Sequence, residues 1–245
     1  MSIASLPPKR GVFTRMPLRM LGSVAVAGLV LAGCGSNVPL PLEGGATQPP
    51  SPTDAVRPLV QQSLDGSLST TGYELLIVVR EGADVAAVYR APESGTVYEG
   101  LMTFHLDGGT LTRTARYRST QKIGTGPDTA VYATTGNPDP NNRKLVLSMY
   151  HDVIDLRQPD APGRYIAEGY VQHNPAVSQG RAGIEGLIKS MGPATAPSTR
   201  TESVVIADGE LVLMVSEIGG GARIADLFRV ENGMVAEHWD FTPVL

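Results

Sequence analysis

Cysteine is almost absent from this sequence, because Cys34 is the only one among its 245 residues. An intrachain disulfide is therefore excluded. A folded domain must rest on its hydrophobic core, for which 42% apolar residues is an ordinary supply. Long hydrophobic runs are lacking too. The apolar run at residues 20–31 spans about 12 residues, which is too short for a membrane-spanning helix of about 20.

Basic clusters and familiar catalytic motifs are also missing. The chain holds 20 basic and 24 acidic residues without a basic cluster, which argues against nucleic acid as a partner. No serine lies in a G-x-S-x-G motif. His173, His238 and Asp240 lack the H-x-H or H-x-x-E spacing of metal ligands. We therefore expect neither a metal ion nor another cofactor.

The N-terminal region has the layout of a secretory signal. Four basic residues precede the apolar run, and two small residues then lead to Cys34. Residues 31–34 (LAGC) resemble the bacterial lipoprotein box, in which the cysteine carries acyl chains such as palmitate and becomes the mature N-terminus. An ordinary signal peptide whose cleavage site lies beside a cysteine is the alternative.

The lipoprotein interpretation divides the chain into four parts. Residues 1–33 form the signal peptide, residues 34–53 a Pro/Gly/Ser-rich tether, residues 54–140 a β-rich segment of unknown role, and residues 141–245 a second domain. Removing the signal peptide takes away four basic residues and no acidic one, so the net charge becomes −8. Because this charge does not attract the chain to an anionic bilayer, the acyl chains would hold it there. We expect an exported protein at the cell membrane or outer membrane, facing the periplasm or the cell exterior.

The first half of the chain has the residue pattern of β-strands. A short helix with Asp54 as its N-cap is expected over residues 54–64. Strands are expected at residues 73–80, 85–90, 96–106 and 111–119. The last of these has little apolar face, so we expect it to be an edge or surface strand.

In the second half, a helical period gives way to the period of strands. Helices are expected at residues 144–156, 163–170 and 183–191, and strands at residues 201–207, 211–217, 223–230 and 234–242. Helices followed by an antiparallel meander predict an α+β fold, in which a curved sheet wraps around packed helices.

Polar residues gather on the last two strands, and the turn between them decides which of these residues share a face. A two-residue loop at Asn232-Gly233 would place Asp226 and His238 on opposite faces. A three-residue loop ending in a left-handed Gly233 would place Asp226 directly opposite His238. We favour the second register. In that register one face carries Asp226, Phe228, Ala236, His238 and Asp240.

Three segments of the second half resemble the SnoaL-like polyketide cyclase family. They are residues 170–175 (YVQHNP), 224–233 (IADLFRVENG) and 237–240 (EHWD). The resemblance covers residues 142–245 and implies the nuclear-transport-factor-2-like fold. That fold is a cone-shaped α+β barrel with three N-terminal helices on a curved antiparallel sheet and a pocket between them. Related folds host aldol ring closure, double-bond isomerisation and epoxide hydrolysis, so the fold alone does not give the reaction.

The resemblance also implies roles for individual residues. Asp240 matches an acid/base carboxylate, and Asp226 matches a protonated acid that donates a hydrogen bond. His238 and His173 would orient a ligand or relay a proton. The other residues expected at the ligand are Tyr170, Asn174, Phe228 and Trp239. Structural roles stay open beside these: a His–Asp hydrogen bond, a packing role for Trp239, and a turn at Asn174-Pro175.

Three functions remain open from the sequence. The first is a lipid-anchored protein that binds a small apolar molecule in the pocket without turnover. The second is an acid/base enzyme of the cyclase, isomerase or hydrolase kind that uses Asp240, His238 and Asp226. The third is an envelope assembly protein that forms a homodimer through its sheet and engages another protein through residues 54–140. Export weakens the cyclase assignment, because polyketide cyclases work in the cytoplasm beside their synthases.

Overall fold

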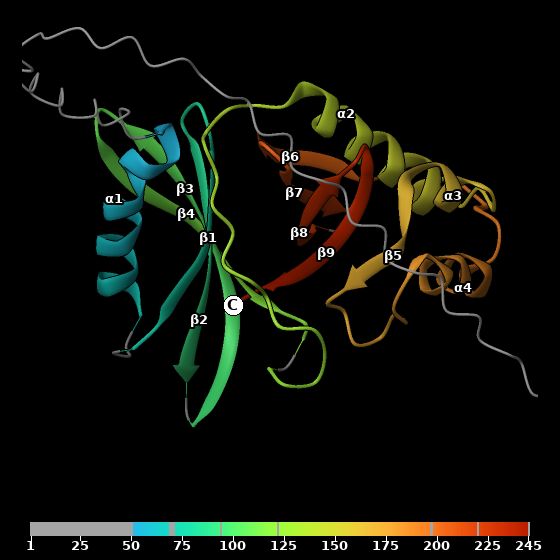
Figure 1. Cartoon of the computed structure of the whole chain (residues 1–245), viewed down its shortest axis with the longest axis horizontal. Coiled ribbons are helices and arrows are strands. Elements are labelled where there is room, and N and C mark those ends of the chain that lie inside the picture. The colour runs from blue at the N-terminus through green and yellow to red at the C-terminus, as the bar shows by residue number, and fades with distance from the viewer. Residues whose placement is uncertain are drawn as a thin grey trace, which may run out of the picture. The chain divides into compact units, whose positions relative to one another are not determined.

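A mostly antiparallel sheet is the framework of this protein (Figure 1). The computed structural model describes residues 51–68, 72–93, 95–121, 123–196, 198–219 and 221–244, all of which belong to the unit 47–245. The predicted signal peptide, Cys34 and the tether up to residue 50 lie outside the described residues. The α+β class predicted from the sequence is confirmed, because helices pack on an extensive antiparallel sheet.

The first half forms one helix and four strands. Helix α1 is followed by strands β1 to β4, with bounds α1 Pro52–Ser67, β1 Glu74–Glu81, β2 Asp84–Glu93, β3 Thr96–Asp107 and β4 Thr110–Ser119. Helix α1 starts earlier than predicted, because Ser51 and not Asp54 is its N-cap. The Ser51 hydroxyl accepts a hydrogen bond of 3.1 Å from the Asp54 backbone N–H.

The second half contains the remaining helices and strands. Their bounds are α2 Pro140–Met149, the π-helical turn η1 Tyr150–Asp155, α3 Ala161–Tyr165, β5 Ile166–Gln172, α4 Arg181–Met191, β6 Thr201–Asp208, β7 Leu211–Ile218, β8 Ala222–Glu231 and β9 Met234–Pro243. The predicted helix at 144–156 corresponds to α2 and η1 together. In the part of the chain that is described, no helix has the length and apolar character to cross a membrane.

The predicted helix at residues 163–170 is wrong over most of its length. Only α3 is helical there, and β5 follows it directly. Strand β5 runs parallel to β9, with Gln172 paired to His238. The free backbone groups along that edge of β9 need partners, and pairing with β5 supplies them. This tertiary pairing overrides the weak local helical pattern.

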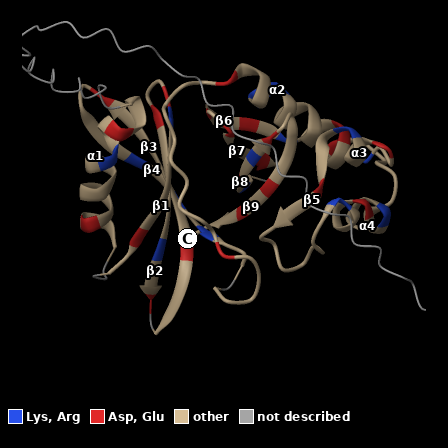
Figure 2. Cartoon of the chain, viewed as in Figure 1, with Lys and Arg blue, Asp and Glu red and all other residues tan. Residues whose placement is uncertain are grey.

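The strand order is β1-β2-β3-β4-β9-β8-β7-β6, with β5 beside β9. The strands of both halves therefore belong to one sheet. The predicted edge position of β4 is wrong, because β4 pairs with β3 on one side and its residues 117–119 pair with β9 on the other. Its surface character is confirmed, since most of its residues are exposed or half-buried. Acidic and basic residues are intermixed over the strands and helices (Figure 2).

Three groups of buried side chains hold these layers together. Helix α1 covers one face of β1–β3, and the helices from α2 to α4 cover one face of β6–β9 (Figure 1). The third group lies between the two halves of the sheet and includes Leu76, Leu101, Leu213, Leu227, Trp239 and Phe241. A central strand thus meets a different core on each face, which matters for the site described below.

The end strands β1 and β6 contact each other along a seam, and Asp208 stabilises this seam through its hydrogen bonds. Its buried carboxylate accepts hydrogen bonds from the Thr53 hydroxyl at 2.8 Å and from three backbone N–H groups: Arg80 at 3.0 Å, Thr135 at 3.1 Å and Gly136 at 2.7 Å. One side chain thus joins α1, β1, β6 and the segment before α2.

We expect Asp208→Asn to lower the free energy of unfolding by about 3 kcal/mol, because an amide would turn N–H groups toward buried N–H donors. Urea denaturation followed by circular dichroism measures this change. Asp107→Asn, at the exposed end of β3, is the matched control and should stay within about 0.5 kcal/mol of the wild type. Equal midpoints for the two variants would show that Asp208 does not stabilise the seam.

Candidate functional site

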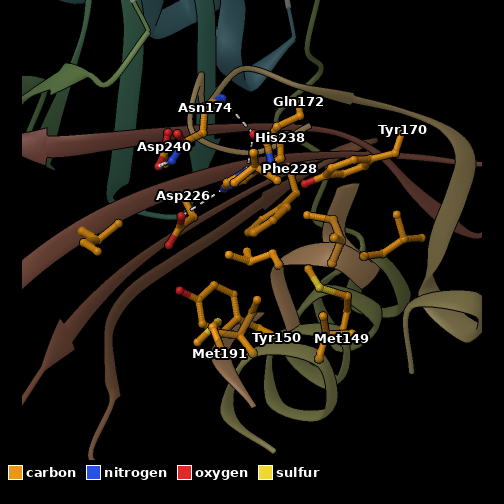
Figure 3. Close-up of a pocket in the computed structure, with 17 residues that line it drawn as sticks. Met149, Tyr150, Tyr170, Gln172, Asn174, Met191, Asp226, Phe228, His238 and Asp240 are labelled. Carbon is orange, nitrogen blue, oxygen red and sulfur yellow. Dashed lines mark hydrogen bonds and ion pairs between the residues drawn. The ribbon is translucent and has the colours of Figure 1, made fainter. Parts of the chain in front are cut away.

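A cavity of about 230 Å³ lies between the helices and strands β5, β8 and β9 (Figure 3). Helix α2, turn η1 and helix α4 supply most of its apolar side chains, and the three strands and the loop after β5 supply most of its polar ones. Its lining consists of Met149, Tyr150, Val153, Ile154, Ile166, Tyr170, Gln172, Asn174, Val177, Ile184, Leu187, Met191, Ile224, Asp226, Phe228, His238 and Asp240. The site is therefore an apolar pocket with a polar wall.

The β8–β9 turn sets the face on which the polar residues lie. Asn232 and Gly233 both have positive φ, at 52° and 74°, and form a two-residue loop in which Glu231 pairs with Met234. The predicted three-residue loop is therefore wrong. A bulge then follows: Val230 pairs with residue 235, whereas residue 229 pairs with residue 237.

The bulge restores most of the predicted face by a different route, whereas Ala236, which was also predicted there, is unpaired in the bulge and does not line the cavity. Asp226 lies opposite Asp240, and Phe228 lies opposite His238. The prediction that Asp226 lies directly opposite His238 is thus wrong. One extra residue on β9 shifts the alternation by one position, so these four side chains still point into the same cavity.

His238 is held by three neighbours. Its Nε2 lies 3.0 Å from Asp226 Oδ1, and its Nδ1 lies 3.1 Å from Gln172 Oε1. Its ring stacks on Phe228 with the ring centroids 4.7 Å apart. The diagonal placement of His238 and Asp226 across two strands is within reach of a long side chain. Figure 3 shows both contacts as dashed lines.

Gln172 determines which nitrogen of the His238 imidazole must carry a hydrogen. The backbone N–H of Asn174 donates to Gln172 Oε1 at 2.9 Å, so this oxygen is an acceptor. His238 Nδ1 must then carry a hydrogen and donate to the same oxygen. His238 Nε2 and Asp226 Oδ1 consequently share one proton, as imidazolium with carboxylate or as neutral imidazole with carboxylic acid.

The two aspartates of the cavity differ in their partners. Asp240 accepts the Thr120 hydroxyl at 2.5 Å on Oδ1 and the Asn174 side-chain N–H at 2.6 Å on Oδ2. Asp226 is only 3% exposed; His238 contacts its Oδ1, its Oδ2 is covered by protein atoms, and the Tyr150 hydroxyl is a further polar neighbour of the carboxylate. Asp226 is therefore enclosed by an imidazole and a phenol, whereas Asp240 is held by an amide and a hydroxyl.

Two tyrosines complete the polar surroundings. Burial raises the pKa of Tyr150, and so do the negative charge of Asp226 and a hydrogen bond to it, despite the nearby Arg200, whose guanidinium lies over the ring at 4.2 Å. Burial also raises the pKa of Tyr170, as do the charges of Asp226 and Asp240. Both phenols therefore stay protonated at neutral pH.

His173 and Trp239, which were predicted at the ligand, do not line this cavity. Trp239 alternates with His238 along β9 and faces the core between the two halves of the sheet, where its indole N–H donates to Thr129 at 2.8 Å. His173 stacks on Trp239 with ring centroids 4.8 Å apart, and its Nε2 lies 2.9 Å from Glu237 Oε1. The predicted residues Tyr170, Asn174 and Phe228 do line the cavity.

Glu237 is the centre of a buried polar cluster on that second face. It contacts His173 through Oε1, and Oε2 accepts hydrogen bonds from the Tyr132 hydroxyl at 2.6 Å and Arg229 Nε at 2.9 Å. Burial alone would raise the pKa of Glu237, but the three hydrogen bonds outweigh it and lower the pKa below its usual value of 4.5.

The sequence analysis missed Gln172, Tyr150 and Glu237. The signal for Gln172 was available, because reading residues 166–172 as a strand places Tyr170 and Gln172 on one face. Tyr150 and Glu237 carry no local signal. Among the described residues, no group of three or more His, Cys, Asp or Glu side chains could hold a metal ion.

Comparison with known proteins finds partial structural similarity. No protein-family model matches the chain, and no curated protein matches it. The structure of TsrD from Streptomyces laurentii is similar at 18% identity, over 42% of this chain and 90% of that one, with a TM-score of 0.35. An NTF-2 like protein of unknown function from Silicibacter pomeroyi DSS-3 is similar at 12% identity, over 40% of this chain and 91% of that one, with a TM-score of 0.31.

The pKa shift of Glu237 predicts a pH-dependent contribution to stability. Because the folded pKa lies below the unfolded value, the ionised carboxylate stabilises the fold above about pH 4.5, and this contribution is lost as the pH falls through the folded pKa. We expect Glu237→Gln to cost about 3 kcal/mol of unfolding free energy at pH 7, with the difference from the wild type shrinking below pH 4.5.

Urea denaturation at about six pH values between about 3 and 8 measures this difference. Glu231→Gln is the control, since Glu231 pairs with the same Arg229 at 3.0 Å but is exposed. It should cost less than about 1 kcal/mol at any pH. A constant gap between Glu237→Gln and the wild type from neutral to acid pH would contradict the assignment.

Proposed function

We propose that this chain is an exported, lipid-anchored protein whose cavity binds a small apolar molecule. The observation that carries the proposal is the cavity itself: about 230 Å³, walled mainly by aliphatic and aromatic side chains, with a few polar groups from β5, β8 and β9 on one side. Ligand pockets combine these two features, an apolar lining for affinity and a few placed polar groups for orientation.

The proposal includes membership of the SnoaL-like family with a nuclear-transport-factor-2-like fold over residues 141–245. Its support is that the three segments resembling that family contribute to the cavity. Tyr170, Gln172 and Asn174 come from the first segment, Asp226 from the second and Asp240 from the third. Residues that carry the resemblance are thus the ones that build the polar wall.

Lipid anchoring is proposed on the sequence of residues 31–34, with Cys34 as the acylated residue. The bilayer would be one partner, held through the acyl chains, and the small molecule the other. A net charge of −8 after signal removal is compatible with this, because acyl chains do not need electrostatic help from the protein.

A second candidate function is acid/base catalysis, which the Asp226–His238 pair favours. A shared proton at 3.0 Å, beside Asp240 and within an apolar cavity, can be given to or taken from a bound molecule. Asp240 would be the acid/base carboxylate, held in position by Asn174 and Thr120.

We expect a small molecule to co-purify with the full chain from its own host, detected by native mass spectrometry from detergent micelles. The same spectrum should show a chain that begins at Cys34 and carries the mass of acyl chains. Ile224→Trp, which fills the half-exposed part of the cavity lining, should lose the ligand. Val131→Trp, at an exposed site outside the cavity, should keep it. An empty wild-type chain, or a ligand that survives Ile224→Trp, would contradict binding in this cavity.

Experiments with the co-purified molecule also distinguish a binding function from a catalytic one. If the chain turns it over, Asp240→Asn should lower kcat while leaving the dissociation constant within about threefold, because a catalytic carboxylate acts in the transition state. Steady-state kinetics and calorimetry measure the two quantities. Full turnover by Asp240→Asn would exclude Asp240 as the acid or base, and no turnover by the wild type would leave binding as the function.

A further inference from the structure

Large apolar side chains are exposed at one end of helix α4. Among the described residues, the exposed large apolar side chains are those of Val97, Val131, Leu156, Met191 and Ile218. Single exposed apolar residues are common on protein surfaces, whereas a group of them marks an interaction site. Leu156, Met191 and Ile218 form such a group, which we term the apolar rim.

Arg157 connects the three members of the apolar rim. It follows Leu156 in the chain, and its Nη1 donates a hydrogen bond of 3.2 Å to the backbone carbonyl of Met191. Arg157, Met191 and Ile218 line one surface hollow, and Leu156 and Arg157 line a second one beside it. The apolar rim therefore surrounds the C-terminal end of α4, although its members lie far apart in the sequence.

The apolar rim also borders the ligand cavity. Among the described residues that line the cavity, Met191 alone is exposed. Tyr150, Ile154 and Met191 line both the cavity and the hollow that contains Ile218. Figure 3 shows Met191 beside Tyr150, across the cavity from Asp226. An apolar molecule that enters or leaves the cavity at Met191 thus passes the apolar rim.

Two cations without an acidic partner accompany the apolar rim. Arg157 and Lys189 line the second hollow, and in the described part of the chain no carboxylate lies within ion-pair distance of either. Glu185, the acidic residue of that hollow, lies 3.6 Å from Arg181 instead. Long basic side chains next to exposed apolar ones suit the surface of a phospholipid bilayer, because their stems lie on apolar surface while their charges meet the headgroups.

The proposed lipid anchor allows this surface to reach a bilayer. Residues 35–51 join Cys34 to helix α1, and a chain of this length spans at most about 60 Å when fully extended. A globular unit of the size of residues 47–245 is about 40 Å across. The anchor therefore permits any surface of the unit to meet the bilayer, and the chemistry of the exposed side chains selects which one does.

We propose that the apolar rim, together with Arg157 and Lys189, rests on the bilayer in which Cys34 is anchored. Its three apolar side chains enter the boundary between headgroups and acyl chains, and the two cations meet lipid phosphates. The cavity then opens toward the bilayer, so an apolar ligand passes between the two without crossing water. This inference rests on the proposed lipid anchor and names the surface that the anchor brings to the membrane.

Single-cysteine labelling tests which surface meets the bilayer. Acylation consumes the Cys34 thiol, so a cysteine introduced elsewhere is the only reactive one. Leu156→Cys and Ile218→Cys carry a nitrobenzoxadiazole fluorophore in the apolar rim, and Val97→Cys and Val131→Cys carry it at the two exposed apolar sites outside the rim. Each acylated full chain is placed in nanodiscs of phosphatidylcholine and phosphatidylglycerol, with and without lipids that bear a nitroxide on an acyl chain.

We expect nitroxide lipids to quench the labels at positions 156 and 218 at least about threefold more strongly than the labels at positions 97 and 131, because only the first two enter the bilayer. Iodide dissolved in the water should show the opposite order. All four positions are exposed, so the label does not have to displace packed side chains.

A charge reversal tests the cationic part of the surface. On the Leu156→Cys background, Lys189→Glu should lower the quenching by nitroxide lipids about twofold, because a carboxylate there is repelled by lipid phosphates. Lys144→Glu is the matched control, since Lys144 is exposed on α2 outside both hollows. Equal losses for the two variants would assign the effect to net charge and remove Lys189 from the surface.

The mass of the full chain separates the failure of this inference from the failure of the anchor. A chain without acyl chains overturns the lipid anchor and this inference with it. An acylated chain whose four labels are quenched alike overturns the membrane-facing rim and leaves the anchor standing. Labels at positions 156 and 218 that are shielded from iodide but not quenched by nitroxide lipids would indicate a protein partner there, which also contradicts the proposal.

Discussion

The register and alternation of strand β9 are the constraint on which the rest of this structure depends. It pairs with β8 along one edge, and along the other with β5 and then β4, so it joins both halves of the sheet. Because successive side chains point to opposite faces, each of its residues belongs to one of two environments. A shift of one residue would exchange the cavity residues His238 and Asp240 for the core residues Glu237 and Trp239.

The two faces use buried polar groups in different ways. Around Glu237, three groups surround one carboxylate, so both of its oxygens have partners beside a hydrophobic core. Around Asp226, an imidazole and a phenol, which also line the cavity, enclose the carboxylate. The first group of contacts lies away from the cavity and stabilises the fold, whereas the second lies on the wall of the cavity, where a ligand would meet it.

Much of the fold follows from local pattern, and the failures have a common cause. All eight antiparallel strands were predicted within about two residues at most ends, because alternation and Gly-rich turns are local signals. The strand character of residues 166–172 and the interior position of β4 were missed, because both depend on pairing with β9 from more than 60 residues away. Trp239 was misplaced although alternation with His238 already assigned it to the other face.

The sequence by itself determined the α+β class, the antiparallel strands, and the pairing of Asp226 with Phe228 and of His238 with Asp240 on one face of each strand, since period-two alternation is a property of the chain alone. Only the tertiary structure decided the β8–β9 register, the bulge that brings these two pairs to the same cavity, and the contacts of Gln172 that place the imidazole proton. It also decided that His173 contacts Glu237 and does not line the cavity. The physical reason is that a hydrogen-bond partner is a neighbour in space, and neither its identity nor its absence is written in the residues adjacent in sequence.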